Sequence, residues 1–466
     1  MRYLENNVPV VNALDGFSTS DVAAGGVNSS AYDEDRRYLG NYLYEHGIRF
    51  EGRALPVEIH PYLIESGEEA VIREKFTRFH SLMEKVVDLY VENQDVRDYL
   101  AFSKSIEDLI LLRYPYFPRI HVCRFDFTFD KDRNPIIYEN NSECPSGLLL
   151  MKKIFAGYRN TKLFRDLCSI KDIEVSPFKY FLEPVFSESL LNIYNAVRRE
   201  ASSRPVVAIL NSRHNTLTNE LALMAEELSV IGCETVSMYV EDLVYDGSRL
   251  IGKNRMIDLC YQKFDSNPAW EYPFTLNRRD ADNYLRALTE RRVIGVNSFA
   301  SSYLIESKAV LALLWEKEFE HYFSSEELGL GRAMTATTKI AMRLTDSEAK
   351  AYKHEKDLFI LKKSFDTRGR SVLLGKNVQQ EVWSKALDSA RTDKNSMYVV
   401  QKYQEHEVCP DITGIDKYIS HAYFVVGGKP VGMLTRVSAD PITNVGRNGS
   451  LGIPLMVAKV VRGTVS

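Results

Sequence analysis

The chain has 466 residues, of which 45% are hydrophobic and 26% charged, a composition typical of globular proteins and unlike that of disordered or collagen-like chains. Lysine and arginine number 59 against 63 acidic residues, and this balance argues against a dedicated nucleic-acid-binding protein. The N-terminus lacks the apolar core of a signal peptide, no apolar run reaches the roughly 18 residues of a membrane helix, and the six cysteines form no CxxC pair. These features predict a cytoplasmic enzyme of two or three domains, without a nucleic-acid or membrane partner.

The N-terminal part combines a polar segment with one long helix. Residues 1–50 are predicted to be irregular, and the Gly/Ser/Asn-rich piece at residues 23–30 suits a mobile loop or a substrate lid. A helix is predicted to begin near Ser66, because Ser66 and Glu69 have the spacing of a capping box. Apolar residues then recur every three or four positions, which is typical of a helix packed against a core. These residues are Ile72, Phe76, Phe79, Met83, Val86 and Tyr90.

Residues 121–141 alternate between apolar and polar side chains and are interrupted by a polar turn, which predicts a β-hairpin. When the two strands are paired antiparallel, Asp126 faces Glu139 and Arg124 faces Asn141. Four polar side chains then share one face of the sheet, while aromatic side chains fill the other.

That polar face has the ligand chemistry of a magnesium site. Asp126, Glu139 and Asn141 offer hard oxygen ligands, and Mg²⁺ completes its coordination with water and substrate phosphates. Arg124 beside them can bind a phosphate oxygen through two parallel hydrogen bonds. The alternative is a solvated face with a cross-strand ion pair, which is the commoner use of such residues in a hairpin.

Small and polar residues follow directly at positions 141–147. Ser142 and Ser146 could cradle a substrate carboxylate there, and an ordinary turn is the alternative. Cys144 is not expected to be a nucleophile, because no histidine or asparagine is placed as its partner.

The middle of the chain alternates strands with helices, which predicts a small Rossmann-like parallel sheet. The sequence has no GxGxxG loop, so this sheet need not hold a dinucleotide. A helix is predicted at residues 305–319, followed by a Gly/Ser/Thr-rich connector to about residue 345. The strands are predicted at residues 206–210, 234–240, 257–264 and 292–296, and the first helix at 217–231.

The C-terminal part returns to strands, predicted at residues 358–362, 371–374, 398–403, 422–426 and 431–437. Lys362 ends the first of them, and a basic loop with Gly369 follows. A lysine at a strand end, together with backbone amides of a glycine-containing loop, suits triphosphate binding, although an exposed basic turn is the alternative. The strand with Gln401 could face an adenine, and Arg436 and Asn444 could lie at adjoining polar positions. Ordinary sheet is the alternative for both.

Taken in order, these motifs resemble the circularly permuted ATP-grasp ligases, in particular the synthetase half of glutathionylspermidine synthase. Arg124-Phe-Asp126 followed by Glu139-Asn-Asn141 is similar to the family's R-x-D…E-x-N hairpin. The metal-binding strands precede the nucleotide-binding lysine strand, which is the permuted order. The other matching positions are Asn297 with Lys308, Lys362 with Gly369, Gln401, and Arg436 with Asn444.

The resemblance implies an α/β (α+β) protein with a circularly permuted ATP-grasp fold and a Rossmann-like pre-ATP-grasp domain. The metal-binding hairpin falls in an N-terminal region of residues 1–200, and the Rossmann-like domain in residues 201–300. Residues 301–466 carry the nucleotide-binding and closing segment.

The same resemblance implies an ATP-dependent carboxylate–amine ligase that forms an amide or peptide bond through an acyl phosphate and releases ADP and phosphate. The implied cofactors are ATP and Mg²⁺, and the partners are small carboxylate and amine substrates. Amino acids or a small peptide, joined in natural-product biosynthesis, are the first choice. A homodimer is compatible with the sequence, which does not settle the oligomeric state.

The resemblance also implies a role for each matching residue. Arg124 and Arg436 are the catalytic residues, which neutralise the transferring phosphoryl group and the acyl phosphate. Magnesium ligands are Asp126, Glu139 and Asn141. The ATP-binding residues are Lys308, Lys362, Gly369 and Gln401, and the substrate-binding residues are Ser142, Ser146 and Asn444.

Two other functions compete with this interpretation. One is a glutathionylspermidine-type synthetase that uses a polyamine, for which the motifs show no acidic cluster beyond the metal ligands. The other is a non-catalytic ATP-grasp scaffold, which has no physical need to keep Asp126, Glu139, Asn141, Lys362 and Arg436 together. Departures from the family pattern also occur, since Lys363 replaces a common proline and Gln262-Lys263 a common pair of arginines.

Overall fold

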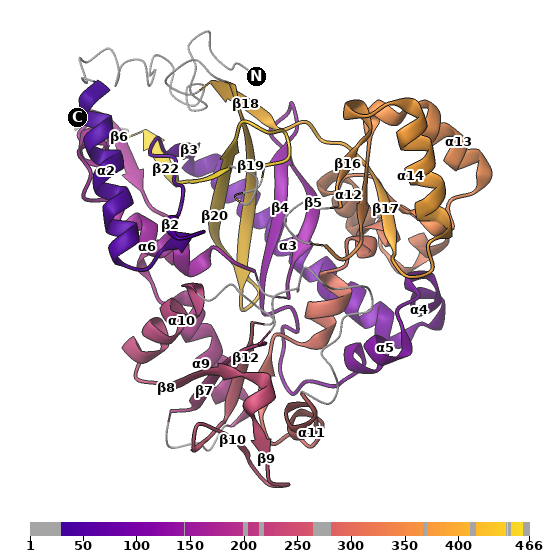
Figure 1. The fold of residues 1–466 in the computed structure, drawn as a ribbon, viewed down its shortest axis with the longest axis horizontal. Coiled ribbons are helices and arrows are strands. Elements are labelled where there is room, and N and C mark those ends of the chain that lie inside the picture. The colour runs from indigo at the N-terminus through magenta and orange to yellow at the C-terminus, as the bar shows by residue number, and fades with distance from the viewer. Residues whose placement is uncertain are drawn as a thin grey trace, which may run out of the picture.

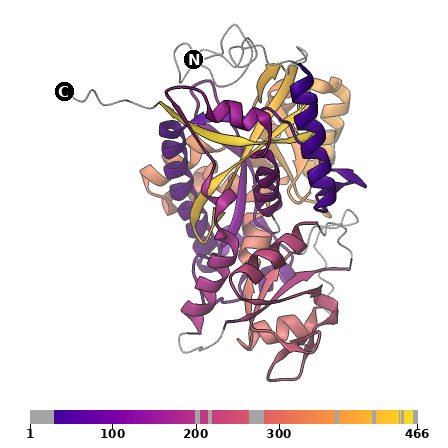
Figure 2. The same cartoon turned by 90° about the vertical axis from the view of Figure 1, so that its left-hand side faces the viewer.

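The computed structural model describes residues 29–143, 145–198, 204–213, 219–263, 281–366, 371–410, 416–443, 445 and 449–459. A six-stranded sheet forms the centre of the molecule, a parallel α/β unit lies below it, and a smaller lobe of sheet and helices lies to the right (Figure 1). The side view shows the same α/β unit beneath the central part (Figure 2).

The central sheet is built around the hairpin that the sequence predicts. Asp126 pairs with Glu139 and Arg124 with Asn141, which confirms the predicted register, and a bulge follows at Asp126/Phe127. The alternation of apolar and polar residues sets this register, because a slip by one residue would move the aromatic side chains to the polar face. The strands, in spatial order, are β21 (Ser450–Gly452), β20 (Lys429–Ser438), β19 (Asp416–Val426), β4 (Val122–Phe129) and β5 (Pro135–Asn141), with β18 (Glu407–Pro410) paired to β19.

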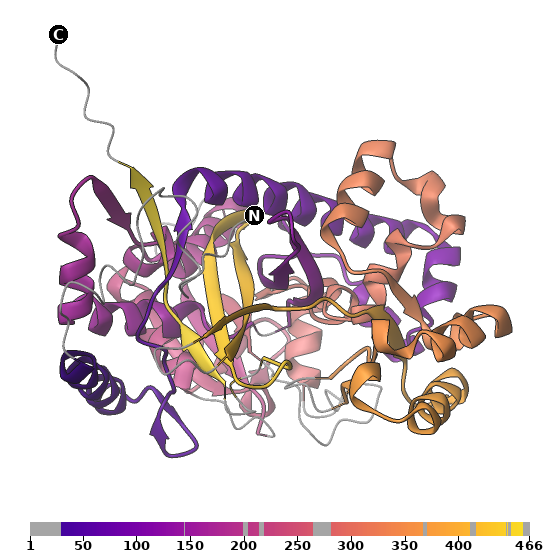
Figure 3. The same cartoon turned by 90° about the horizontal axis from the view of Figure 1, so that it is seen from above.

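The long helix α3 (Ser66–Glu92) lies along one face of this sheet, as the view from above shows (Figure 3). All six residues of the predicted apolar stripe are buried. The Phe76 ring lies 5.1 Å from Phe127 and 4.8 Å from Tyr423, between ring centroids, and so joins the helix to two strands. Aromatic pairs of this kind add to the energy of area burial.

The predicted capping box at the start of α3 is wrong. The helix does begin at Ser66, but no side chain caps its first amide groups. The Ser66 hydroxyl instead donates to the carbonyl oxygen of Val457 at 3.2 Å, because strand β22 (Pro454–Lys459) lies beside it. Capping boxes occur at two later helices, with Ser324 and Glu327 and with Thr345 and Glu348.

A second error concerns the N-terminal segment, where residues 29–45 form the helix α2 (Ser29–Glu45) rather than irregular structure. Few apolar residues mark this helix, but Leu39 and Leu43 are one turn apart and both are buried. They belong to the same core as α6 (Leu148–Tyr158). Most of the predicted lid at residues 23–30 lies outside the described residues.

The parallel α/β unit confirms the predicted Rossmann-like sheet. Its strands follow the order β13 (Ile294–Val296), β12 (Leu259–Gln262), β7 (Val206–Asn211) and β8 (Glu234–Tyr239). Its helices are α10 (Asn219–Val230) and α11 (Asp282–Thr289). A small antiparallel sheet of β9 (Val244–Tyr245), β10 (Leu250–Gly252) and β11 (Arg255–Met256) is attached to it.

The right-hand lobe is an antiparallel sheet covered by helices that bury Trp383 and Leu387. Its strands follow the order β14 (Thr338–Ile340), β17 (Tyr398–Lys402), β15 (Phe359–Lys363) and β16 (Leu373–Leu374). The helices of this lobe are α13 (Asp346–His354) and α14 (Gln380–Thr392), whereas α12 (Ser325–Met334) packs against α3 and β5 of the central part. The predicted connector up to residue 345 is therefore wrong, because it contains α12 and β14.

The predicted helix at residues 305–319 is also wrong. The structure has a π-helical turn, η2 (Ala300–Ile305), and two 3₁₀ segments, η3 (Lys308–Leu314) and η4 (Lys317–Tyr322). The physical reason lies at Ser364, whose carbonyl oxygen accepts from the Lys308 amide at 3.1 Å and whose hydroxyl accepts from the Ala309 amide at 3.2 Å. These long-range hydrogen bonds replace the ladder of a regular helix.

The remaining elements enclose the central sheet. The helices are α4 (Gln94–Leu100), α5 (Lys104–Ile110), α7 (Lys162–Cys168), α8 (Lys179–Leu182) and α9 (Val185–Val197). The other strands are β1 (Arg49–Phe50), β2 (Arg53–Ala54), β3 (Tyr62–Glu65) and β6 (Ile173–Ser176). No helix in the described parts of the chain combines the length and apolarity that crossing a membrane requires. The domain boundaries at residues 200 and 300 stay predictions.

We expect Phe76→Ala to lower the free energy of unfolding by about 3–5 kcal/mol, because the change leaves a cavity between α3 and the central sheet. Val71→Ala on the same helix is the matched control, since Val71 is 55% exposed, and its effect should stay within about 0.5 kcal/mol. Urea unfolding of the full chain, followed by circular dichroism, measures both. Equal losses in the two variants would contradict the placement of Phe76 in the core.

Candidate active site

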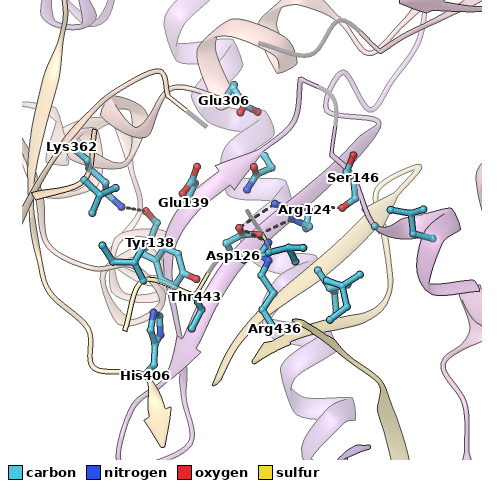
Figure 4. Close-up of a pocket in the computed structure, with 18 of the residues that line it drawn as sticks. Arg124, Asp126, Tyr138, Glu139, Ser146, Glu306, Lys362, His406, Arg436 and Thr443 are labelled. Carbon is cyan, nitrogen blue, oxygen red and sulfur yellow. Dashed lines mark hydrogen bonds and ion pairs between the residues drawn. The ribbon is translucent and has the colours of Figure 1, made fainter. Parts of the chain in front are cut away.

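A cavity of about 360 Å³ lies where the central sheet, the α/β unit and the right-hand lobe meet (Figure 4). Residues predicted from the sequence line it from five different strands and one turn. These are Arg124, Asp126, Glu139, Asn141, Ser146, Lys362, Gln401 and Arg436. The fold therefore brings together side chains that stand up to about 310 positions apart, as Asp126 and Arg436 do.

Asp126 is held between two arginines. Arg124 donates from Nε to Oδ1 at 2.7 Å and from a terminal nitrogen to Oδ2 at 3.2 Å, and Arg436 donates to Oδ2 at 2.8 Å. Burial disfavours the carboxylate, but the two guanidinium groups outweigh this effect and lower the pKa of Asp126. The group is thus an anion that the arginines stabilise, and both arginines keep further donors for a ligand.

Arg124 also fixes the turn that follows β5. It donates to the Ser146 carbonyl oxygen at 2.6 Å, so that Ser146 faces the cavity. Ser142 lies elsewhere, because it is fully buried and its hydroxyl donates to the Ser301 carbonyl oxygen at 2.8 Å. Its position does not bring it to the cavity lining. Cys144, Gly369 and Asn444 lie outside the described residues.

Two lysines approach the hairpin from the other side. Lys308 pairs with Glu139 at 2.9 Å and donates to the Asp366 carbonyl oxygen at 3.0 Å. Lys362 donates to the Tyr138 carbonyl oxygen at 3.1 Å and has no carboxylate partner among the described residues. Burial lowers the pKa of Lys362 to about 8, with Lys308 adding to this effect and Glu139 opposing it. A buried ammonium of this kind is suited to binding an anion.

Gln401 lies further into the right-hand lobe. It pairs across the sheet with Thr338 and with Ile360, and its amide donates to the Thr338 hydroxyl at 2.8 Å. The residue is 1% exposed and still lines the cavity. Its place on β17, next to the strand with Lys362, agrees with the predicted adenine-side position, which stays a prediction.

Sequence reasoning missed Glu306, which lines the cavity beside the hairpin. Its carboxylate accepts from the backbone amides of Ser142 and Glu143, the latter at 2.9 Å. Burial raises the pKa of Glu306 to about 7, although these two amides and Lys308 oppose the rise. The only signal in the sequence is that Glu306 stands two positions before Lys308.

An ion pair from the α/β unit was also missed. Lys263 and Glu220 are 3.2 Å apart and both side chains are 4% exposed. Glu220 accepts from the amides of Gly147 and Leu149, at 3.1 and 2.9 Å, and so satisfies donors at the start of α6. Lys263 donates to the Pro145 carbonyl oxygen at 2.8 Å. The pair joins the α/β unit to the turn after β5.

His406 is a third missed residue of the lining. Its Nδ1 is buried without a hydrogen-bond partner among the described residues, and its ring centroid lies 5.7 Å from that of Tyr138. Burial, together with the nearby cations, lowers the pKa of His406 to about 4. The imidazole is therefore neutral at physiological pH and has a ring nitrogen available for a ligand.

The chemistry of the donor set fits magnesium. The described residues contain no group of three or more His, Cys, Asp or Glu side chains that could hold a metal. Asp126 on β4 lies opposite Glu139 on β5, and Asn141 stands two residues further along β5, so an amide is present beside the two carboxylates. The Nδ2 atom of Asn141 is buried without a hydrogen-bond partner among the described residues, so no hydrogen bond from this nitrogen fixes the orientation of the amide. Mg²⁺ takes few protein ligands when phosphates complete its shell.

The low pKa of Lys362 has a consequence for stability. An unfolded lysine keeps its proton up to a pKa near 10.5, whereas the folded one releases it near 8, so the folded state gains stability as the pH rises between these values. We expect the free energy of unfolding of the wild type, relative to that of Lys362→Met, to rise by about 2 kcal/mol between pH 8 and pH 10. Urea unfolding at each pH measures this difference.

Lys385→Met is the control for that measurement, because Lys385 is exposed on α14 in the same lobe. It reports the general effect of removing one lysine. The free energy of unfolding of the wild type, relative to each variant, should rise with pH more for Lys362→Met than for Lys385→Met. Equal rises would contradict the burial of the Lys362 ammonium without a compensating charge.

Comparisons with known proteins agree with this geometry. A family model described as glutathionylspermidine synthase preATP-grasp matches residues 41–450. No curated protein matches the sequence. A glutathione synthetase-like effector from Globodera pallida is 11% identical, covers 93% of this chain and 98% of its own, and has a TM-score of 0.60, which shows a shared fold.

Two further solved structures are more distant. A candidate gamma-glutamylcysteine synthetase from Methylobacillus flagellatus is 9% identical over 78% of this chain and 84% of its own, with a TM-score of 0.40. The D-cycloserine synthetase DcsG is 14% identical over 55% of this chain and 76% of its own, with a TM-score of 0.32. The family match covers most of the chain, and so this protein belongs to the glutathionylspermidine synthase pre-ATP-grasp family, a family of ATP-dependent ligases with the circularly permuted ATP-grasp fold.

Proposed function

We propose that this protein joins a small carboxylate substrate to an amine through an acyl phosphate, and that it releases ADP and phosphate. The observation that carries the proposal is the arrangement of cations in one cavity. Arg124 and Arg436 flank Asp126, and the buried Lys362 lies across the cavity without a carboxylate partner among the described residues. Such an array suits a ligand with several phosphate charges, and family membership supports ATP as that ligand.

The side chains divide the work between binding and charge stabilisation. Lys362 and Lys308 would contact the phosphates, and Gln401 and Gly369 would bind other parts of the nucleotide. Arg124 and Arg436 would stabilise the charge that develops on the transferred phosphoryl group. Phosphoryl transfer depends on positioning and electrostatics, so the proposed step needs no protein nucleophile.

Asp126 positions both arginines, because it accepts hydrogen bonds from each of them. In the proposed active state Asp126, Glu139 and Asn141 would also hold Mg²⁺. When bound, the ion neutralises phosphate charge and orients the phosphates for transfer. Ser146 and Asn444 stay proposed substrate contacts.

Amino acids or a small peptide are the proposed substrates, and a polyamine is the alternative that the family name suggests. Two carboxylates of the cavity outside the proposed metal site weigh against a polycation, because they already have partners. Glu220 binds Lys263, and Glu306 accepts two backbone amides. A role in natural-product biosynthesis, a cytoplasmic location and a homodimer are part of this proposal.

Replacing the amine substrate by hydroxylamine tests the reaction class. With ATP, Mg²⁺ and a panel of amino acids and dipeptides, the protein should yield a hydroxamate, ADP and orthophosphate, because hydroxylamine intercepts an activated acyl group. Mass spectrometry and phosphate release measure the products. AMP with pyrophosphate would show adenylation instead and would contradict the acyl phosphate.

The same assay on two arginine variants separates catalysis from general effects of the substitution. Arg436→Gln should lower turnover by on the order of 10²-fold or more, because it removes a charge beside the reacting phosphoryl group. Arg255→Gln is the matched control, since Arg255 is exposed on β11 of the α/β unit. Normal turnover by Arg436→Gln would remove Arg436 from the catalytic set.

The proposed metal site is best tested at Asn141, because its side chain has no partner among the described residues that its removal would leave unpaired. Asn141→Ala should raise the Mg²⁺ concentration needed for half-maximal ADP release by roughly 10-fold or more. The exposed Asn160→Ala should not change it. An unchanged Mg²⁺ requirement in Asn141→Ala would exclude Asn141 as a ligand.

A further inference from the structure

One side of the active-site cavity is apolar, and none of the roles proposed above uses it. The apolar wall consists of Ile48, Phe50, Leu55, Leu150, Leu434 and Leu451. Four of these side chains are buried, whereas Phe50 and Leu150 are half-buried and leave apolar surface facing the cavity. An apolar surface inside a pocket that also holds convergent charged groups is typical of a substrate subsite.

The apolar wall is held in place by backbone hydrogen bonds. The Leu451 amide donates to the Pro56 carbonyl oxygen at 3.0 Å, and the Glu58 amide donates to the Leu451 carbonyl oxygen at 2.7 Å. The segment that carries Phe50 and Leu55 is therefore attached to the edge of the central sheet. The wall is a built part of the cavity rather than a surface exposed by chance.

The apolar wall lies next to the arginines. Leu434 and Arg436 are alternate residues of β20, and Leu451 pairs with Arg436 across the sheet. Leu434 also approaches Gly147, where an added Cβ would lie 3.5 Å from its Cδ1 atom. In the close-up, Lys362 lies on one side of Asp126 and Ser146 on the other (Figure 4). The wall thus adjoins the end of the cavity opposite to the lysine that would bind phosphate.

We infer that the apolar wall binds an aliphatic or aromatic side chain of the carboxylate substrate. This inference rests on the proposed function, because the arginines next to the wall would hold the carboxylate that becomes the acyl phosphate. A carboxylate placed at Arg124 and Arg436, with the phosphates toward Lys362, leaves the remainder of that substrate over the wall. The substrate is then an amino acid or short peptide with an apolar side chain near its reacting carboxyl group.

Charges at the border of the apolar wall support the same substrate class. Glu220 and Lys263 lie there as an ion pair, and each makes further hydrogen bonds to backbone atoms of the turn at residues 145–149. An acidic or basic substrate side chain would have to compete with these contacts. Arg49 at the rim contacts Tyr44, with its guanidinium carbon 3.9 Å from the ring centroid.

The test compares substrates that differ only in side chain. The panel contains L-leucine, L-phenylalanine, glycine and L-glutamate, each as the free amino acid and as its N-glycyl dipeptide, with hydroxylamine as the amine. Each buried methylene contributes about 4-fold, so kcat/KM for leucine or phenylalanine should exceed that for glycine by on the order of 10²-fold. Glutamate should be no better than glycine. Calorimetry of the same compounds gives a binding readout that does not need turnover.

A pair of variants locates the effect. Phe50→Ala should lower kcat/KM for leucine and phenylalanine by roughly 10-fold more than kcat/KM for glycine, because it removes apolar surface from the wall. Leu182→Ala is the matched control, since Leu182 is 57% exposed on α8 and does not line the cavity. Circular dichroism confirms that both variants fold. Leu150→Ala is the second wall variant if Phe50→Ala is unstable.

The outcomes separate this inference from the proposed function. Turnover of glycine or glutamate at least as fast as that of leucine and phenylalanine would overturn the apolar subsite and leave the ligase proposal intact. A second outcome is that phenylalanine binds, that Phe50→Ala weakens this binding, and that no compound is turned over. This outcome would support the subsite and overturn the ligase proposal. If neither apolar amino acid nor its dipeptide binds or reacts, the subsite is overturned.

Discussion

The carboxylate of Asp126, buried between Arg124 and Arg436, is the interaction on which the rest of the site depends. It connects β4 to β20 across the intervening strand β19, and through Arg124 it also fixes the Ser146 carbonyl oxygen. Removing one partner of a buried ion pair typically costs about 3–5 kcal/mol, because the remaining charge is left uncompensated. The position of both arginines, and with them the shape of the cavity, therefore follows from one side chain.

A second set of contacts holds the same hairpin from the α/β unit. The Asn297 side chain accepts from the Val122 amide at 2.8 Å and donates to the carbonyl oxygens of Val122 and Ser142, at 2.7 and 2.9 Å. These atoms lie at the start of β4 and just after the end of β5. Together with the Glu220–Lys263 pair, Asn297 attaches the parallel sheet to the open end of the hairpin, where β4 begins and β5 ends. The two units therefore cannot move independently without breaking buried hydrogen bonds.

Much of the central site could be predicted because its signals are local. The alternation in residues 121–141 sets both the face and the register of Asp126, Glu139 and Asn141, and the structure confirms this register. The Rossmann-like sheet follows from alternating strands and helices in the same way. The capping box at Ser66 fails because a strand more than 300 positions away takes its hydroxyl. The helix at residues 305–319 fails for the same kind of reason, since Ser364 replaces its internal hydrogen bonds.

Long-range features of the site had no comparable signal. Glu306 gains its importance from amides of Ser142 and Glu143, which no sequence spacing reveals. The apolar wall combines the buried Leu434 with Phe50 and Leu150, two half-buried residues that pack against the core of their own segments. A sequence pattern shows which face of an element is apolar, but it does not show that three such faces border one cavity.

The apolar wall lies beside a pair of arginines, and this arrangement affects how strongly the arginines interact with a bound charge, whichever substrate binds. Charges interact more strongly where water is excluded, because the effective dielectric constant falls. Leu434 and Leu451 flank Arg436 and keep water from one side of it, whereas Asp126 neutralises it on another. A substrate side chain packed on the wall would exclude further water from the same place. In a ligase of the proposed kind this packing would both strengthen the hold of the arginines on the acyl phosphate and protect that intermediate from hydrolysis. Binding energy gained at the wall would then serve the reaction at the arginines, which links the choice of substrate to the rate of its conversion.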